Sequence, residues 1–375
     1  MKPSRFRIAV PDEDLDDLRR RLAASRLPDD LGDGWTYGAD RAYLAELLDH
    51  WRNGYDWRDH EKAVNEYAHY RVELDGQPIH YMHAPRPGAT PLLLIGGWPW
   101  TFWDFAEVLP LLADFELVVP DLPGYGFSTP LRGTGVGYAE TAELFHRLMT
   151  EVLGHQRYGV YGSDWGAIVG EQLAHTRPDA VVGLHTTMPF PLDAAPVSPD
   201  LWTPEEEARR EAYTAWGRTG AGYFQMHVTR PQTVAYLADS PAATAAWLVE
   251  KLHDWTDHDG DFEKAYPRDR VLTTLSIYWF TNSMGSSARM YAESLRRPWQ
   301  PVHDDVPVIG VPTAVAAYPK EPTAQPRRWV ERYFNLQRYT VMDRGGHFPA
   351  VEDPRGLAAD IAAFFTTLHG QEHTS

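Results

Sequence analysis

The sequence Tyr-Gly-Val-Tyr-Gly-Ser-Asp-Trp-Gly-Ala at residues 158–167 predicts an apolar strand, a Gly-x-Asp-x-Gly turn and then a helix. Gly162 and Gly166 permit a sharp turn and let the helix pack closely, so the apex side chain, Asp164, should stand exposed at the end of the strand. A carboxylate at such an apex predicts attack on an electrophilic carbon, followed by hydrolysis of the resulting ester by water. The alternative is a plain turn in which Asp164 only caps the helix.

The neighbouring Ser163 is not expected to be the nucleophile. A turn centred on this serine would need small residues at positions 161 and 165, which are Tyr161 and Trp165 in this chain.

Strands and helices alternate around this turn. The apolar runs at 91–95 and 116–120 are typical of parallel strands buried on both faces. Further strands are predicted at 182–185, 312–316 and 338–342, with helices at 101–112, 138–153, 167–175 and 354–368. The pattern predicts an α/β protein with a mostly parallel sheet.

Two further regions interrupt this alternation. Amphipathic helical patterns, followed by an alternating segment at 70–74, predict an N-terminal helical meander over 1–75 that packs on the core. Aromatic-rich helical patterns over 190–300 predict a helical lid inserted between strands. The core is therefore expected in two parts, 76–189 and 301–375.

Composition excludes several functional classes. The 375 residues contain no cysteine, which excludes a thiol nucleophile and disulfides. No long apolar run or apolar N-terminal segment is present, so we expect a cytoplasmic protein with no membrane anchor. A net charge of −17 argues against nucleic acid as a partner, and 14 Trp, 19 Tyr and 14 Phe favour a site for an apolar organic ligand.

Hydrolysis of the ester requires a general base. His347 is the candidate, because Gly-Gly-His-Phe at 345–348 follows the last predicted strand, where this nucleophile–acid–histidine chain order places the base. Glu321, just past the strand at 312–316, is the candidate for the carboxylate that orients it. Asp304, Asp305 and Asp343 are competing candidates for that acid.

The remaining histidines that attract attention are interpreted as structural. They are His175, His185, His227, His253 and His258. The acidic segment 257–261 lacks the ligand spacing of a calcium loop, and we interpret it as a solvated turn, with no metal site expected.

A tetrahedral oxyanion requires two backbone N–H donors. Trp165, directly after the nucleophile, is expected to supply one. Trp98, in the glycine-rich loop Gly-Gly-Trp-Pro-Trp at 96–100, is expected to supply the other. The alternative for this loop is a simple turn at the end of a strand.

Several motifs together resemble the microsomal-type epoxide hydrolase family over nearly the whole chain. These motifs are Gly-Trp-Pro at 97–99 with Phe-Trp at 102–103, Asp-Leu-Pro-Gly-Tyr-Gly-Phe-Ser at 121–128, Gly-Ser-Asp-Trp-Gly at 162–166, Tyr-Trp at 278–279, Arg-Met-Tyr at 289–291 and Arg-Gly-Gly-His-Phe at 344–348. The resemblance implies an α/β-hydrolase core with a helical lid, Asp164 as nucleophile, and His347 with Glu321 as its charge-relay pair. It also implies that two lid tyrosines, Tyr223 and Tyr291, bind the epoxide oxygen.

The expected reaction converts a small apolar epoxide to a vicinal diol with no cofactor. Trp103 and Phe190 are predicted to contact the substrate. The chain departs from the family pattern at Gly96, where a histidine is usual, and at Ser163, where a glycine is usual. A haloalkane dehalogenase, a non-catalytic ligand-binding homologue and a homodimeric state all stay open.

Overall fold

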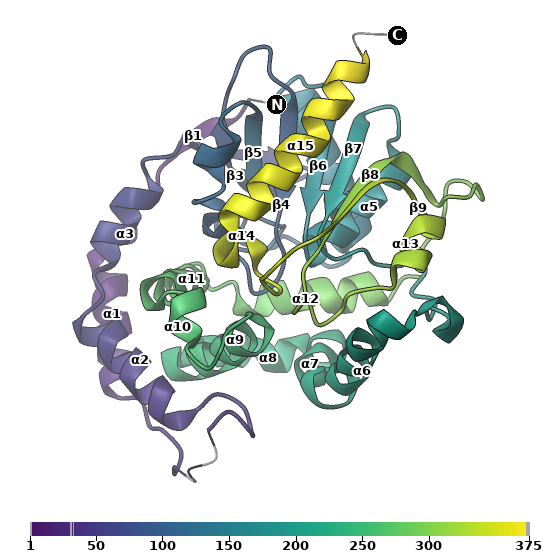
Figure 1. Ribbon diagram of the computed structural model, residues 1–375. Helices are drawn as coiled ribbons and strands as arrows, with labels where there is room; N and C mark the ends of the chain where they lie inside the picture. Colours follow the sequence, from purple (N-terminus) through teal and green to yellow (C-terminus); the bar gives the residue numbers. More distant parts are fainter. Residues whose placement is uncertain (1, 31, 33, 373–375) are drawn as a thin grey trace.

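The computed structural model describes residues 2–30, 32 and 34–372, and its core is a nine-stranded sheet (Figure 1). The strand order is β1-β2-β3-β5-β4-β6-β7-β8-β9. Strands β4 to β9 pair in parallel, whereas β1, β2 and β3 extend the sheet antiparallel from β5. The strands are β1 (Ser4–Phe6), β2 (His69–Leu74), β3 (Gln77–Ala84), β4 (Pro91–Ile95), β5 (Glu116–Pro120), β6 (Tyr158–Gly162), β7 (Val181–Thr186), β8 (Ile309–Ala317) and β9 (Phe334–Val341).

Fifteen α-helices are present in the described part of the chain. They are α1 (Asp12–Ala23), α2 (Arg41–Asn53), α3 (Trp57–Val64), α4 (Tyr138–Arg147), α5 (Trp165–Thr176), α6 (Glu207–Ala215), α7 (Gly222–Thr229), α8 (Pro231–Ala235), α9 (Pro241–Trp255), α10 (Phe262–Ala265), α11 (Arg268–Phe280), α12 (Met284–Leu295), α13 (Arg327–Tyr333), α14 (Pro349–Glu352) and α15 (Pro354–Glu372).

Helices cover both faces of the parallel part of the sheet. Helix α5, with α4 packed against it, lies on one face, and α15 crosses the other (Figure 1). Every residue of β5 and β6 is buried. This two-sided burial explains why both strands are continuous apolar runs, as predicted from the sequence.

The lid comprises helices α6 to α12, inserted between β7 and β8 (Figure 1). Because β6 and β7 run parallel, their carboxyl ends meet at the edge of the sheet that this insertion covers. The lid therefore lies over the turn that presents Asp164.

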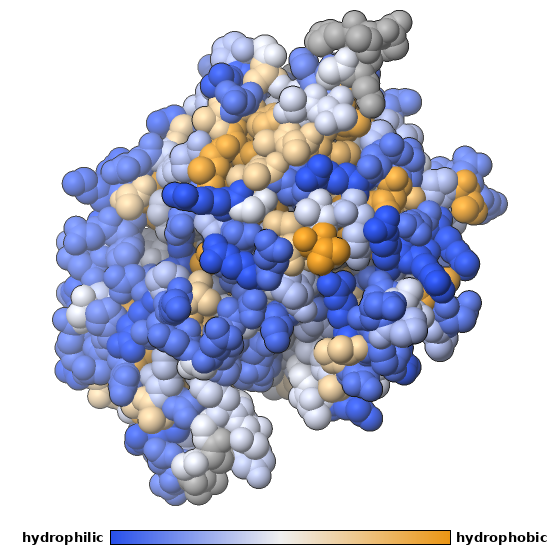
Figure 2. Space-filling view, viewed as in Figure 1, coloured by the Kyte–Doolittle hydropathy of each residue, from blue (hydrophilic) through white to orange (hydrophobic). Residues whose placement is uncertain are grey.

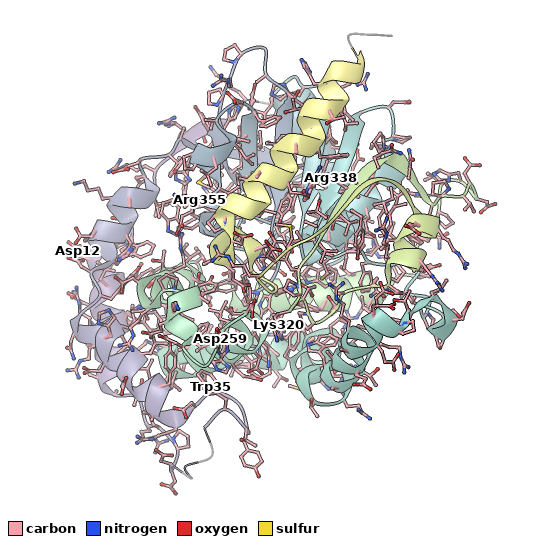
Figure 3. All side chains as sticks on the ribbon, viewed as in Figure 1. Asp12, Trp35, Asp259, Lys320, Arg338 and Arg355 are labelled. Carbon is pink, nitrogen blue, oxygen red and sulfur yellow. The ribbon has the colours of Figure 1, made fainter. Side chains whose placement is uncertain are left out.

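The helices of the N-terminal segment contact helices of the lid. Helices α1 and α2 contact α9, and α3 contacts α11, so these helices brace the lid. The indole of Trp51 donates to the hydroxyl of Ser276 in α11 at 3.0 Å, and Trp35 stacks on His253 of α9 with ring centroids 3.7 Å apart (Figure 3). Strands β1 and β2 of the same segment join the sheet.

Some elements differ from the sequence prediction. β1 and β3 were not expected: β1 has three residues, and β3 contains a proline and polar histidines that mask its alternation. The segment 101–112 forms two short 3-10 helices, Phe102–Phe105 and Leu109–Leu112, the second with a proline in its first turn. The helix expected over 138–153 ends as α4 at Arg147 and continues as a π turn over Leu148–Val152.

The face seen in Figure 2 is mostly hydrophilic, with hydrophobic residues gathered in the upper part where α15 crosses the sheet. In the acidic turn, Asp259 (Figure 3), Gly260 and Asp261 are exposed, whereas Asp257 and His258 are half-buried. Within the described ranges, none of the helices combines the length and apolar content that a membrane crossing requires.

Candidate active site

The turn after β6 presents Asp164 in a left-handed backbone conformation. Its φ is 54° and its ψ is −128°, which is uncommon for a residue with a side chain and is typical of strained functional turns. Although Asp164 precedes α5, its side chain accepts no capping hydrogen bond from that helix. The alternative of a plain helix cap therefore does not describe this residue.

One oxygen of Asp164 is held by the loop after β4. The backbone N–H of Trp98 donates to Asp164 Oδ1 at 2.6 Å. Gly97 makes this approach feasible, because a Cβ at that position would overlap the Asp164 carboxylate. The Trp98–Pro99 peptide bond is cis. The Trp98 N–H thus lies against the carboxylate, as its predicted role as an oxyanion donor requires, and Trp165, the other predicted donor, is the first residue of α5.

Ser163 faces away from this chemistry. Its side chain is fully buried, and its hydroxyl accepts a hydrogen bond from Thr187 Oγ1 at 2.8 Å.

His347 lies between two carboxylates. Its Nδ1 is 2.7 Å from Glu321 Oε2, and its Nε2 is 3.4 Å from Asp164 Oδ2. The first contact is a hydrogen bond, whereas Nε2 has an ion-pair distance but no hydrogen-bond partner among the described residues. Glu321 is fixed in turn, because its Oε1 accepts from the backbone N–H and the hydroxyl of Thr323 at 3.0 Å and 2.6 Å.

The structure brings Glu321 to His347 and leaves the competing acids outside. Asp304, Asp305 and Asp343 are all exposed to solvent. Burial alone would lower the pKa of His347, but the charge and hydrogen bond of Glu321, together with the nearby charge of Asp164, outweigh burial and raise this pKa to about 10. Burial alone would raise the pKa of Glu321, yet the charge of His347 and the bonds from His347 and Thr323 hold it below its usual value.

The loop that carries His347 has a support that the sequence did not reveal. Glu352 accepts backbone N–H bonds from both sides of the histidine, from Gly346 at 2.8 Å and Phe348 at 2.8 Å, and also from Asp257 at 2.6 Å. The backbone N–H of His347 itself donates to the carbonyl of Trp255 at 2.8 Å. These bonds fix the histidine from the lid side and from α14. The only sequence signal was a glutamate shortly after the Gly-Gly-His-Phe motif.

Two lid tyrosines share the space above Asp164. Tyr223 of α7 and Tyr291 of α12 are 7% and 2% exposed, and their ring centroids are 6.0 Å apart at an interplanar angle of 86°. The hydroxyl of Tyr291 is buried and has no hydrogen-bond partner within the described chain. Burial is the main cause that raises the pKa of both phenols well above the usual value. Nearby acidic groups, which include Asp164, raise it further. Both tyrosines therefore keep their protons and can act as donors.

Aromatic and basic side chains hold Tyr223 in place. Trp98 stacks on its ring at 5.1 Å and 9°, and the ammonium of Lys251, a buried residue, lies 5.2 Å from the ring centroid. His227 packs edge-on against both tyrosines, and its Nε2 accepts from the indole N–H of Trp247 at 3.1 Å. Burial, followed by the charge of Lys251, lowers the pKa of His227 to about 3, so this histidine stays neutral.

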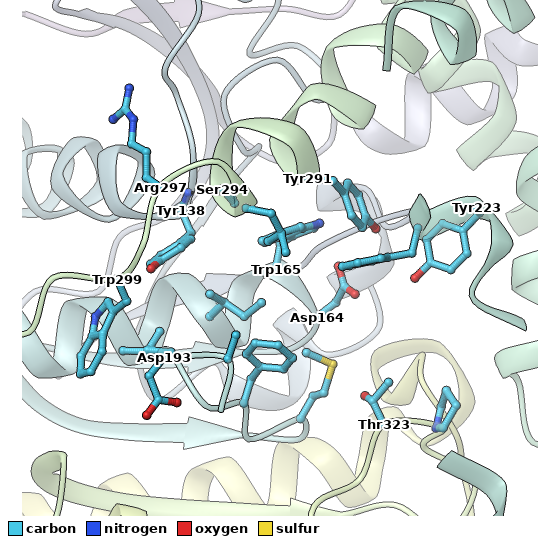
Figure 4. Close-up of a pocket in the computed structure, with 18 of the residues that line it drawn as sticks. Tyr138, Asp164, Trp165, Asp193, Tyr223, Tyr291, Ser294, Arg297, Trp299 and Thr323 are labelled. Atoms are coloured by element: carbon cyan, nitrogen blue, oxygen red, sulfur yellow. Dashed lines mark hydrogen bonds between the residues drawn. The ribbon is translucent and has the colours of Figure 1, made fainter. Parts of the chain in front are cut away.

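A cavity of about 440 Å³ is lined by Asp164, His347 and both lid tyrosines. Asp164, Tyr223 and Tyr291 lie close together at one end, and Tyr138, Arg297 and Trp299 lie at the other (Figure 4). Most of the wall is apolar and aromatic, including Trp165, Phe190, Trp216, Phe224, Trp255 and Trp299.

Only one of the two predicted substrate contacts lines this cavity. Phe190 does, whereas Trp103 does not. The ring of Trp103 instead packs edge-on against Tyr67 and lies 5.4 Å from the guanidinium of Arg270. Its proximity to the oxyanion loop in sequence gave no information on the direction of its side chain.

Comparison with known proteins gives a consistent assignment. Residues 3–105 match the family described as "Epoxide hydrolase N terminus", and residues 90–354 match "alpha/beta hydrolase fold". A relative from Stigmatella aurantiaca (strain DW4/3-1) is 38% identical, covering 98% of this chain and 85% of its own length. Epoxide hydrolase 1 of Sus scrofa is 33% identical over 98% of this chain and 89% of its own length.

The chain belongs to the epoxide hydrolase family. The structure of Aspergillus niger epoxide hydrolase is similar throughout, with a TM-score of 0.87 and 29% identity over 98% of this chain and 97% of that one. The predicted α/β-hydrolase fold and the predicted class of enzyme, an epoxide hydrolase, are both confirmed.

This epoxide hydrolase carries Gly96 where the resemblance led us to expect a histidine. In the structure a Cβ at Gly96 would lie 3.2 Å from Cε3 and 3.3 Å from Cβ of Trp100, which is buried. The Trp100 side chain therefore occupies the space next to position 96. The Trp98 N–H still reaches Asp164 across the unusual loop.

Proposed function

We propose that this epoxide hydrolase opens an apolar epoxide through an ester on Asp164. One observation carries the assignment. The carboxylate has Oδ1 hydrogen-bonded to the Trp98 N–H and Oδ2 beside His347. It shares its cavity with the buried hydroxyl of Tyr291, which has no hydrogen-bond partner in the part of the chain that the structure describes.

In the first step Asp164 attacks a ring carbon of the epoxide. The new bond joins a carboxylate oxygen to that carbon, and the carbon–oxygen bond of the strained ring breaks. The ring oxygen stays on the substrate and develops negative charge, so it requires donors. Tyr223 and Tyr291 supply them, and one proton moves to the alkoxide.

In the second step water hydrolyses the ester. His347 Nε2 removes a proton from water, which adds to the carbonyl carbon of the Asp164 ester. The N–H groups of Trp98 and Trp165 stabilise the oxyanion that forms. The acyl–oxygen bond then breaks, and the departing alkoxide takes the remaining proton of the added water to complete the diol. The proton on His347 returns to the tyrosine that gave up its own, and the regenerated carboxylate retains one oxygen from water.

The cavity favours apolar substrates with an aromatic or bulky alkyl group. Its volume of about 440 Å³ lies within the range of small-molecule sites, and its wall is mainly aromatic. Diol formation from a panel of aryl, alkyl and polycyclic epoxides would define the preference. A strictly hydrophilic preference would contradict this proposal.

The tyrosine pair favours an epoxide over a haloalkane. A departing halide leaves the substrate and needs no proton, whereas an opened epoxide retains an alkoxide that must receive one. Release of halide from chloro- or bromoalkanes without turnover of any epoxide would favour the dehalogenase reaction instead. Tight binding of epoxides without turnover of either class would favour a non-catalytic protein.

Isotope labelling tests the covalent step. In a single turnover in water labelled with heavy oxygen, the label should enter the Asp164 carboxylate before it reaches the diol. Mass spectrometry of the peptide that contains Asp164 would detect it. Label in the diol of the first turnover would mean direct attack by water. The Asp164→Ala variant should be inactive.

A further inference from the structure

A cluster of metal-ligating side chains lies at the amino ends of the parallel strands. It consists of His83, Glu116 and His155, whose ligand atoms all lie within 4.8 Å of one another. The Nε2 atoms of both histidines approach the same oxygen of Glu116, at 2.7 Å for His83 and 2.9 Å for His155. No step of the epoxide mechanism uses these residues.

The sheet register explains why these residues meet. His83 is near the end of β3 and pairs with Val118 of β5. Glu116 is the first residue of β5, two positions before Val118, so its side chain lies on the same face as His83. His155 precedes β6, at the opposite end from Asp164. Because β6 spans 5 residues, the cluster is separated from the active site by about 17 Å of strand.

We propose that His83, Glu116 and His155 form a binding site for a divalent transition metal of the Zn²⁺ type. Two imidazole nitrogens and one carboxylate oxygen are a ligand set that zinc accepts, with water in the fourth position. Ca²⁺ and Mg²⁺ prefer oxygen ligands alone, so the two histidines disfavour both.

The present geometry is close to that of a metal site. Zinc bonds of about 2.0–2.2 Å place tetrahedral ligand atoms about 3.3–3.5 Å apart. The two nitrogen–oxygen distances would therefore have to open by about half an ångström. The side chains of His83, Glu116 and His155 are 13%, 11% and 21% exposed, which gives them room to adjust and gives solvent access to the fourth position.

The ion would join three separate segments: the end of β3, the start of β5 and the turn before β6. Because this arrangement exists only in the folded chain, zinc should stabilise the folded state by mass action. At a free zinc concentration 100 times the Kd, the Tm should rise by about 3 °C for a chain of this length.

Calorimetric titration of the chelator-treated 375-residue chain with ZnCl₂ tests the site. We expect one tight equivalent per chain together with the rise in Tm. His155→Gln and Glu116→Gln should each lower the affinity for zinc by more than ~10–100-fold, which is the loss that follows removal of an outer-shell partner. His155→Gln is the more informative variant, because His155 lies in a turn and its loss should leave the sheet intact.

Two matched measurements keep the result unambiguous. The active site also holds a histidine between two carboxylates and could bind zinc instead. The His347→Gln variant must therefore still bind one zinc ion tightly. Epoxide turnover by His155→Gln should match that of the unmodified chain, because His155 lies outside the catalytic cavity. Failure to bind zinc in the micromolar range, or binding unchanged in both cluster variants, would show that the cluster is only a hydrogen-bonded trio.

Discussion

Replacing Asp164 with Asn should lower the pKa of His347 sharply. The charge of Asp164 lies 3.4 Å from His347 Nε2. At an effective dielectric constant of about 20, two unit charges at this distance interact by about 5 kcal/mol, which corresponds to a pKa change of about 3.5. Since the pKa of His347 is raised to about 10, the neutral side chain at position 164 should bring it to between about 6 and 7.

The same change occurs during catalysis, because the ester of Asp164 is also neutral. A pKa of about 10 means that His347 of the free enzyme should be a doubly protonated, positively charged imidazolium at pH 7 and pair with both carboxylates. Once the ester forms, the pKa of His347 should fall toward 7, and only then can His347 accept a proton from water. Ester hydrolysis should therefore accelerate as pH rises and level off above about 7 in single-turnover experiments.

Selective labelling of histidine ring carbons and NMR titration would measure this pKa, with the His347 signal assigned by its loss in His347→Gln. The exposed Asp343 provides a matched control, and Asp343→Asn should leave the titration unchanged. A His347 pKa near 6.5 in the unmodified chain, or one still near 10 in Asp164→Asn, would refute this electrostatic coupling between Asp164 and His347.

Substitutions of the two lid tyrosines, Glu321 and Glu352 test the remaining groups. Tyr223→Phe and Tyr291→Phe should each slow ester formation by ~10–1,000-fold in stopped-flow measurements, and a double variant with the unmodified rate would make both tyrosines packing residues. Glu321→Gln should slow ester hydrolysis, with ester accumulating in a burst, while Asp343→Asn should not; the reverse pattern would transfer the acid role to the aspartate. Glu352→Ala removes the acceptor of three backbone N–H groups and should lower the free energy of unfolding by about 1–3 kcal/mol in urea titrations, with slower turnover. Unchanged stability and turnover in that variant would show that Glu352 does not hold the His347 loop in place.

The sequence alone determined the apolar core strands, the turn at Asp164 and the order of the candidate catalytic residues. The runs of β4, β5 and β6 are continuous and apolar because both faces of each strand are covered. The Gly-x-Asp-x-Gly pattern marked Asp164, because few residue types fit so tight a turn. Chain order then indicated His347, and Glu321 was the best of several acids by position alone.

The tertiary structure decided what depends on contacts between distant segments. It selected Glu321 over three other acids, since only Glu321 is buried against His347. It also directed Phe190 into the cavity and Trp103 away from it. Side-chain direction across elements is set by packing, which leaves no periodic trace in the sequence.

The tertiary structure also decided three other features. These are the strands β1 and β3, the contacts of α1–α3 with the lid, and the backbone hydrogen bonds that Glu352 accepts around His347. Each depends on partners that lie far along the chain or on backbone groups that every residue has. Residue type and spacing predict which chemistry a chain can perform, but the three-dimensional packing decides which of several similar side chains perform it.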